Sequence, residues 1–408
     1  MTTEVRVLQP DDWDRWFSNL ELAFGTREAA EEREFDRSVT ECERSIGVWD
    51  GGEVVGTAGA FSFRLSVPGG ALVPAAGVTM VSVAPTHRRR GLLTSMMRRQ
   101  LDDVRALGEP LAVLTASEPA IYGRFGYGAA TQRMSAEIQS ARVRLQLPPG
   151  AEEIGLRLAD PAAVLPRCEE LYARQVPKRP GMLARLPGWE RKGVLDPAEE
   201  RGGGTALQCV LAERAGELVG YARYHVQPEW VGTVPEGAVR LRDLEAEDPA
   251  AYAALWQYLF DLDLTSKVVL RNRPADDAWQ LLVSDIRRCS VRVEDGLYVR
   301  PVDVGAALEA RTYATDVDVV LEVTDDFCPW NTGRWRLSGG PKGAVCARTD
   351  DPAELTLSVR ELGAAYLGGV SLGALAAAGR VREERRGALA QAATAFASPV
   401  APWLPHGF

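Results

Sequence analysis

Apolar residues near the N-terminus recur with the spacings of a strand, a helix and a hairpin. Residues 4–8 alternate between polar and apolar, which is typical of a half-buried strand. Asp11 or Asp12 can cap the following helix, whose apolar positions fall on one face: Trp13, Trp16, Phe17 and Leu20. Asp50-Gly51-Gly52 separates two strand-like runs, residues 45–49 and 53–63, and so predicts a hairpin.

The stretch from Val78 to Gly128 carries the strongest pattern. A β-branched run, residues 78–83, stops at Ala84-Pro85, where proline removes a ladder donor. A helix follows, with one apolar stripe at a spacing of 3.6 residues: Leu92, Leu93, Met96, Met97, Leu101 and Val104. Another strand and a turn rich in glycine and aromatic residues complete the stretch. The pattern predicts a strand–helix–strand unit with a polar turn before the helix.

Three arginines, Arg88 to Arg90, occupy that turn directly before the helix. A helix start carries free N–H groups and the positive end of the helix dipole, and so attracts anions. Guanidinium groups at this point can bind phosphate oxygens in bidentate fashion. The G-x-x-x-x-G-K-[ST] and G-x-G-x-x-G phosphate-binding patterns are missing. The turn therefore predicts a pyrophosphate site of another type, with a solvated surface turn as the alternative.

The region after Leu147-Pro148-Pro149-Gly150 repeats the N-terminal order of elements. The matching segments are residues 155–161 with 5–10, residues 216–222 with 52–58, and residues 239–244 with 78–83. In the second copy the residues before the helix are Glu245 to Asp248, an acidic run that would repel a pyrophosphate. We therefore expect a duplicated unit in which only the first copy binds the anionic ligand.

From about Val291 onward, short apolar runs alternate with Gly, Pro, Asp and Asn residues. The expected strands cover residues 297–302, 318–323, 333–337, 344–348 and 354–359, and the expected helices cover the second half of 361–379 and residues 387–397. With the boundary near residue 147 and the length of 408 residues, this pattern predicts three domains: residues 1–147, 148–290 and 291–408.

The chain carries a net charge of −9, so the charge of the cationic turn is opposite to that of the chain as a whole. The negative net charge also argues against general nucleic-acid binding. Six cysteines are scattered without a C-x-x-C pair, which favours free thiols in a reducing cytosol. The N-terminus lacks a signal-peptide pattern, and the uncharged runs at residues 65–87 and 362–379 do not read as membrane helices. We expect a cytoplasmic protein without a membrane partner.

Arg88-Arg89-Arg90-Gly91-Leu92-Leu93 resembles the [RQ]-x-x-G-x-[GA] loop with which GCN5-related N-acetyltransferases (GNATs) hold the coenzyme A pyrophosphate; Leu93 departs from the small residue usual there. Together with Val83 to His87 and Ile121 to Gly128, the loop resembles one subfamily, the actinobacterial enhanced intracellular survival (Eis) acetyltransferases. The resemblance implies an α/β (α+β) fold with tandem GNAT-like mixed sheets, flanking helices and a C-terminal sterol-carrier-like α+β domain. It also implies a catalytic first unit, a degenerate second unit, acetyl-CoA as co-substrate, no metal, and a homohexamer.

Acetyl transfer needs a polarised thioester carbonyl and a firmly held cofactor. Backbone N–H groups at the end of the first strand can meet the carbonyl and the pantetheine amides, and those around residues 89–94 can take the pyrophosphate. Ser117 and Glu118 end the next strand, where the cofactor arm would pass. The expected cofactor-binding residues are Val81, Ser82, Val83, Arg88, Arg89, Arg90, Gly91, Leu92, Leu93, Thr94, Ser117 and Glu118.

Tyr122 is the expected general acid, because it follows the strand that splays from the cofactor strand and aligns with the acid of the resembled family. Tyr127 is the competing choice and is interpreted as structural. His87 fits a capping or phosphate-side role, and His225 belongs to the second copy.

The last residues, 398–408, contain three prolines with Trp403, Leu404 and Phe408, which favours an extended docked tail over a frayed one. In the resembled subfamily the C-terminal carboxylate enters the N-terminal active site as general base, and the resemblance gives that role to the main-chain carboxylate of Phe408. A carboxylate with a pKa of about 3.5 is a weak base, so it would act through water.

These assignments predict direct acetyl transfer from acetyl-CoA to an amine, with aminoglycoside-like polyamines as substrates. Residues 78–128 contain no cysteine, which disfavours an acetyl-cysteine relay. The acidic segment Glu28–Asp36 is a candidate wall for a cationic substrate, with a solvated helix face as the alternative. The other functional hypotheses are a protein or peptide lysine acetyltransferase and, from the third region, a lipid or sterol carrier.

Overall fold

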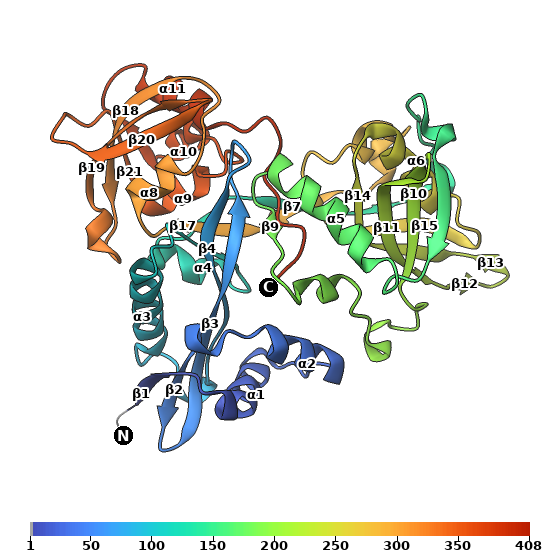
Figure 1. Cartoon of the computed structure of the whole chain (residues 1–408), viewed down its shortest axis with the longest axis horizontal. Helices are drawn as coiled ribbons and strands as arrows, with labels where there is room; N and C mark the ends of the chain where they lie inside the picture. The colour runs from blue at the N-terminus through green and yellow to red at the C-terminus, as the bar shows by residue number, and fades with distance from the viewer. Residues whose placement is uncertain (1–2) are drawn as a thin grey trace. The chain divides into compact units, whose positions relative to one another are not determined.

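The computed structural model describes residues 3–408, which form two compact units (Figure 1). The first unit contains the chain up to Thr131, the short segment Arg179–Ala184 and everything from Gly296 to Phe408. The second contains Gln132–Lys178 and Arg185–Asp295. The chain leaves the first unit after Thr131 and returns to it twice, so the N-terminal and C-terminal regions belong to the same unit.

A mixed sheet forms the N-terminal part of the first unit, in the order β1-β2-β3-β4-β5-β17-β6, with β9 paired to β3. β2 and β3 form the predicted hairpin, β3 and β4 pair antiparallel over their length, and β4 and β5 run parallel. The strands are β1 (Glu4–Val7), β2 (Ile46–Asp50), β3 (Glu53–Ser66), β4 (Leu72–Val83), β5 (Leu111–Thr115), β6 (Gly128–Ala129), β9 (Leu183–Ala184) and β17 (Leu297–Pro301).

Four helices accompany this sheet: α1 (Trp13–Phe24), α2 (Ala30–Val39), α3 (Leu92–Ala106) and α4 (Pro119–Tyr122). The predicted apolar faces are confirmed, because the stripe residues of α1 and all those of α3 except the half-buried Leu93 are buried. Small residues on the facing strands, Ala76 of β4 and Ala112 of β5, share a core with Met97 and Leu101 of α3. The small side chains leave room for the helix to lie close to the sheet.

The C-terminal region, residues 303–408, has its own five-stranded sheet in the order β20-β19-β18-β21-β22. Its strands are β18 (Val317–Thr324), β19 (Gly333–Gly340), β20 (Gly343–Arg348), β21 (Leu355–Ser358) and β22 (Val381–Glu383). Its helices are α8 (Val304–Glu309), α9 (Val359–Ala365), α10 (Leu372–Ala377) and α11 (Ala388–Phe396). Residues 397–408 follow α11 as an extended tail without helix or strand.

Several strands cross the limits that the sequence predicts between domains. Residues 297–302, expected in the third region, provide β17 of the first sheet, between β5 and β6. β7 (Gln132–Ile138), expected in the first region, pairs with β15 and β16 of the second unit. Strand pairing therefore exchanges segments across residues 147 and 290, and the domain limits at those residues stay a proposal.

The second unit repeats the plan of the first, with a seven-stranded sheet in the order β16-β7-β15-β14-β11-β10-β8. A hairpin (β10–β11) leads to β14, which runs parallel to β15, as β4 runs parallel to β5. The strands are β8 (Gly155–Ala159), β10 (Gln208–Arg214), β11 (Glu217–Gln227), β14 (Gly237–Ala246), β15 (Thr265–Pro274) and β16 (Arg292–Asp295), with a small hairpin of β12 (Trp230–Val231) and β13 (Val234–Pro235).

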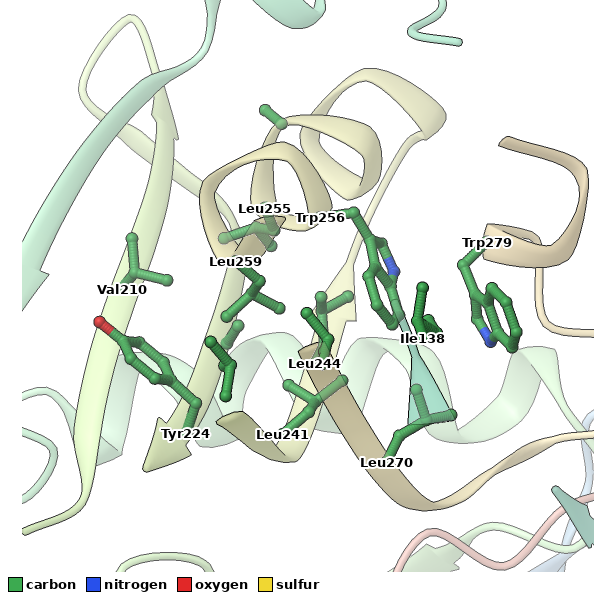
Figure 2. Close-up of a cluster of buried hydrophobic side chains, with 14 of the residues drawn as sticks. Ile138, Val210, Tyr224, Leu241, Leu244, Leu255, Trp256, Leu259, Leu270 and Trp279 are labelled. Carbon is green, nitrogen blue, oxygen red and sulfur yellow. The ribbon is translucent and has the colours of Figure 1, made fainter. Parts of the chain in front are cut away.

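The helices of the second unit are α5 (Leu165–Gln175), α6 (Pro249–Phe260) and α7 (Trp279–Leu282). Helix α6 follows β14 as α3 follows β4, which confirms the duplication that the sequence predicts. Figure 2 shows Leu255, Trp256 and Leu259 of α6 above Leu241 and Leu244 of β14. The ring centroids of Trp256 and Trp279 lie 5.9 Å apart at one end of this core.

In the second unit, backbone N–H groups at the start of α6 already have a hydrogen-bond acceptor within the chain. The side chain of Asp248 accepts hydrogen bonds from the backbone N–H groups of Ala250 and Ala251. Beyond the parallel pairing of β14 and β15, the guanidinium of Arg273 donates to the carbonyl of Leu244 at 2.8 Å and to the carboxylate of Asp277. A carboxylate at the cap and an arginine across the strands occupy the positions that correspond to the predicted anion site of the first unit.

All six cysteines are free thiols, and five of them are buried. Within residues 3–408, no group of three or more His, Cys, Asp and Glu side chains is arranged to hold a metal ion. No helix in the described part of the chain is long and apolar enough to cross a membrane.

Candidate active site

A cavity of about 620 Å³ lies where β4 ends, α3 begins and the chain leaves β5. This volume is within the usual range for small-molecule sites, roughly 300–1,000 Å³. The predicted residues that line it are Val81, Ser82, Val83, Arg88, Arg89, Gly91, Leu92, Leu93, Thr94, Ser117, Glu118 and Tyr122. Arg90 and Phe408 are predicted site residues that do not line it.

Four lining residues were missed by sequence reasoning: Ala23, Phe24, Ile121 and Arg124. Phe24 is the last residue of α1 and is 49% exposed, outside the buried stripe of that helix. A large aromatic residue off the core face at a helix end is the signal that could have identified it. Ile121 and Arg124 flank Tyr122 and could have been inferred from its proposed role.

The cavity opens because β4 and β5 separate. Their parallel pairing covers only three residues of β4, and Gly77 opposite Val113 is the last pair. The register of β3 against β4 then shifts, and Met80 takes a left-handed conformation with φ of 52°. The hydroxyl of Thr57 donates to the carbonyl of Met80 at 2.7 Å and holds this bulge in place. The backbone of β4 beyond the bulge is therefore not paired with β5.

The cationic turn presents an uncapped helix start to the cavity. Gly91 is the N-cap of α3 with φ of 82°, and no side chain caps the helix. Arg88 and Arg89 are exposed and line the cavity. His87 also lines the cavity, and its ring nitrogens have partners: Nε2 lies 3.1 Å from Asp50 Oδ2 and Nδ1 lies 2.8 Å from the hydroxyl of Thr86. Free N–H groups, two guanidinium groups and an open strand edge fit a pyrophosphate with an amide-bearing arm.

Tyr122 ends the short helix α4 and lines the cavity, although only 8% of its surface is exposed. Burial, and to a smaller extent the carboxylate of Glu118, raises the pKa of Tyr122 to about 12. The phenol therefore keeps its proton at neutral pH and can donate it but cannot act as a base. Its ring meets the ring of Tyr127 edge to face, with centroids 6.0 Å apart.

Tyr127 has a different environment, five residues further on. Its side chain is fully buried, and among residues 3–408 its hydroxyl has no hydrogen-bond partner. Burial raises its pKa, while the positive charge of Arg300 acts in the opposite direction. Tyr127 lies behind Tyr122 and does not line the cavity.

The C-terminal tail docks onto the first unit. Trp403 and Leu404 are buried, and the backbone N–H of Trp403 donates to the carbonyl of Pro180 at 2.9 Å. In Figure 1 the red tail ends beside the green segment that carries β9. The Phe408 ring packs on Phe63 with centroids 5.0 Å apart, and a Cβ atom added at Gly77 would lie 3.3 Å from it. The Phe408 ring therefore lies beside the last residue of β4 that pairs with β5.

The acidic segment before and within α2 contains one arginine, which pairs with carboxylates of α1. Arg33 binds Glu21 at 2.7 Å and Asp14 at 3.2 Å. Burial raises the pKa of Glu28 to about 8, and the nearby carboxylates of Asp36, Glu32 and Glu21 add to this effect. The segment carries less negative charge at neutral pH than its sequence suggests.

Family models match the chain in three places. The description "Acetyltransferase (GNAT) domain" matches residues 4–130 and, through a second model, residues 181–301. The description "Sterol carrier protein domain" matches residues 304–405.

Relatives match over the whole chain. A protein of Streptomyces avermitilis named "Uncharacterized N-acetyltransferase" is 66% identical over all of both chains. N-acetyltransferase Eis of Mycobacterium tuberculosis is 34% identical over 98% of each chain. The crystal structure of Eis1 from Mycobacterium abscessus covers both chains completely, with a TM-score of 0.86 and 34% identity.

The fold, the cavity at the separated strands and the domain matches define a GCN5-related N-acetyltransferase, a class of enzyme that transfers acetyl from acetyl-CoA to an amine. Within this class, the chain belongs to the Eis family.

Proposed function

We propose that this N-acetyltransferase acetylates amines of aminoglycoside-like or polyamine substrates by direct transfer within a ternary complex. The observation that carries the proposal is the docked C-terminus, which ends at Phe408 beside the point where β4 and β5 separate. An anionic group at this point suits an approaching ammonium group. No residue of the cavity lining is a cysteine, in keeping with direct transfer.

Acetyl-CoA, when bound, supplies an activated acetyl thioester. Arg88 and Arg89, with the N–H groups at the start of α3, would bind its pyrophosphate. The backbone of Val81 and Val83, which is not paired with β5, would bind the arm and polarise the carbonyl. Ser117 and Glu118 line the opposite side of the cavity. Arg90 would add charge near the turn without direct contact.

Two groups of the chain would move protons. The Phe408 carboxylate would take a proton from the amine through water, which fits its low expected pKa of about 3.5. Tyr122 would donate its proton, or a strong hydrogen bond, to the sulfur as negative charge develops there. A phenol with a pKa of about 12 is a weaker acid than a thiol, whose usual pKa is about 8.5, so Tyr122 would stabilise the developing thiolate mainly through a hydrogen bond, which strengthens as the charge on sulfur grows.

The choice of a cationic small molecule rests on charge. The whole chain carries a net charge of −9, and α2 with the two residues before it contributes Glu28, Glu32 and Asp36 close together. A polycationic substrate would favour the ionised form of Glu28 and release its proton on binding. The relatives named Eis support the same class of enzyme but not the choice of substrate.

A thiol-release assay tests this proposal. Purified protein with acetyl-CoA is given a panel of aminoglycosides, linear polyamines and lysine-bearing peptides, and free coenzyme A is measured. We expect release that depends on the amine and is fastest with aminoglycosides. Faster release with lysine peptides would favour the protein acetyltransferase hypothesis, and no amine-dependent release, with lipid retained on purification, would favour a carrier. A homohexameric assembly and a cytoplasmic location are further proposals, which mass photometry and cell fractionation can test.

A further inference from the structure

We propose that Arg300 is a positioning residue that holds the turn carrying Tyr122 in its working geometry. The inference rests on the proposed function, in which Tyr122 is the proton donor. It also gives the C-terminal region a part in catalysis besides delivering the tail.

Arg300 is fixed by charge and hydrogen bonds in the interior of the first unit. It lies on β17 and has no exposed surface. Its Nη2 donates to both carboxylate oxygens of Asp325, at 3.0 and 2.8 Å, and its Nη1 donates to the carbonyl of Pro301 at 2.7 Å. Asp325 also accepts from the side-chain amide of Asn331 and the backbone N–H of Cys328, both at 2.9 Å. The guanidinium therefore has one well-defined position.

That position is directly behind the turn after Tyr122. Gly126 has φ of 86°, and a Cβ atom added there would lie 3.2 Å from Arg300 Cζ and 2.8 Å from Val359 Cγ1. Gly123, at the start of the turn, faces another guanidinium, because a Cβ atom there would lie 2.8 Å from Arg360 Cζ. Arginine side chains thus form a close wall behind two glycines of the turn.

Backbone hydrogen bonds and ring packing within the turn connect these arginine side chains to Tyr122. The backbone N–H of Gly126 donates to the carbonyl of Gly123 at 3.1 Å, and that of Tyr127 donates to the carbonyl of Tyr122 at 3.3 Å. The Tyr127 ring meets the Tyr122 ring edge to face, and since the Tyr127 hydroxyl has no partner in residues 3–408, packing alone fixes that ring. A shift of the guanidinium would move Gly126, then the Tyr127 ring, and with it the phenol in the cavity.

Stability alone is a poor explanation for this ion pair. The desolvation free energy of two buried charges offsets most of their electrostatic attraction, and variants with apolar side chains of similar size in their place are often as stable. A buried guanidinium that donates from Nη2 to both oxygens of Asp325 and from Nη1 to the carbonyl of Pro301 does fix geometry, which a donor aimed at a developing charge requires. The pair lies behind the proposed donor, where fixed geometry matters most.

The test compares Arg300→Lys with Arg223→Lys. Lysine keeps the charge but loses the planar fork. Arg223 is the matched control, since it is also buried and binds Asp243 with two nitrogens, at 2.8 and 2.5 Å, but belongs to the second unit. We expect Arg300→Lys to lower kcat by about 10–100-fold, the effect of a small misplacement, with the KM for acetyl-CoA within about twofold. Arg223→Lys should leave kcat unchanged.

A double-mutant cycle shows whether Arg300 acts through Tyr122. In a Tyr122→Phe background, Arg300→Lys should cause no further loss of kcat. Full additivity of the two losses would overturn the proposal, as would wild-type kcat in a folded Arg300→Lys protein or an equal loss in Arg223→Lys. If Arg300→Lys does not fold, Asp325→Asn, which keeps the hydrogen-bonding shape but removes the negative charge, must show the same loss and the same non-additivity.

The two proposals fail in different ways. If wild-type protein releases no thiol with any amine, the proposed function fails before a variant is made. If wild-type protein is active but Tyr122→Phe is equally fast, the donor role fails and the positioning role with it, while the acetyltransferase activity stands.

Discussion

Two tyrosines five residues apart show how surroundings decide chemistry at the scale of single residues. Tyr122 lines the cavity and keeps its proton up to about pH 12, because burial and Glu118 raise its pKa. Tyr127 is buried behind it with a hydroxyl that has no partner in residues 3–408. The same side chain can thus donate a proton at one position and serve only as packing at the other.

Tyr122→Phe should lower kcat by about 10²–10⁴-fold, the usual contribution of a general acid, with little change in the KM for acetyl-CoA. Tyr127→Phe is the matched control, because it keeps the ring and removes only a hydroxyl without a partner, so kcat and Tm should not change. Steady-state kinetics on both variants measure the difference. Equal activity of Tyr122→Phe and wild type would remove Tyr122 from the acid role.

The same residue predicts the alkaline side of the pH profile. A donor is active while protonated, so a pKa raised to about 12 keeps Tyr122 competent throughout the range below that value. Loss of this proton should therefore not lower the kcat of the wild type between pH 8 and about pH 10.5. Any decline of kcat in that range should also be present in Tyr122→Phe. A decline near pH 10 that is absent in the variant would mean that the phenol has its ordinary pKa.

At the scale of elements, two equivalent helix starts have opposite chemistry. Helix α3 begins at an uncapped glycine with Arg88 and Arg89 beside the cavity, whereas α6 is capped by the carboxylate of Asp248. An anion is attracted to the first helix start and repelled from the second. The duplicated plan therefore leaves one unit suited to the cofactor.

Arg88→Ala and Arg89→Ala should each raise the KM for acetyl-CoA by about tenfold or more, since a hydrogen bond to a charged group contributes about 1.5–3 kcal/mol. Arg90→Ala should have a smaller effect because Arg90 does not line the cavity. Arg99→Ala is the control, on the helix that follows the turn; Arg99 is exposed and paired with Asp103 at 2.8 Å. The KM for acetyl-CoA is measured for all four variants at two salt concentrations. Equal KM values in the four variants would contradict the assignment of Arg88 and Arg89 to pyrophosphate binding.

Arg273 should stabilise the second unit by filling the place where its parallel strands part. Arg273→Met removes the ion-pair partner of the buried Asp277 and leaves it with the hydroxyl of Tyr252, so the free energy of unfolding should fall by about 3–5 kcal/mol. Arg214→Ala removes an ion pair with Asp248 that is largely exposed, and should leave the unfolding midpoint nearly unchanged. Urea unfolding followed by tryptophan fluorescence measures both, and equal midpoints would contradict a role for Arg273 in stability.

At the scale of the whole molecule, the order of the chain brings its far end to the first unit. Segment Arg179–Ala184 returns from the second unit to pair with β3, and its Pro180 carbonyl accepts from the tail at Trp403. Trp403 and Leu404 anchor the tail, so the last residues are held without contributing much of the buried area themselves. The tail can therefore be altered at its end without loss of the fold.

The terminal carboxylate predicts a specific pattern among tail variants. Adding residues after Phe408 moves the carboxylate away, and should lower kcat by about 10²-fold or more with little change in Tm. Phe408→Leu keeps the carboxylate and an apolar anchor, and should retain most of the activity. A fully active extended protein would eliminate the carboxylate as the base.

The sequence by itself determined the local elements and their charge. The stripes of α1 and α3, the hairpin, the cationic turn and the acidic start of α6 follow from spacings of a few residues, which local periodicity and capping chemistry fix. The lining of the cavity followed as well, since eleven of its residues lie next to one turn or one strand end and were expected as cofactor-binding residues.

Only the tertiary structure decided which distant segments meet. β17 lies between β5 and β6, Arg300 lies behind Gly126, and Phe24 of α1 joins the cavity lining, and none of these follows from local spacing. Strand pairing and buried contacts between residues far apart in sequence depend on how the whole core packs, and the same local pattern is compatible with several partners. The physical reason for this difference is the separation along the chain over which each effect acts. Periodicity depends on a few neighbouring residues, whereas packing depends on the whole unit.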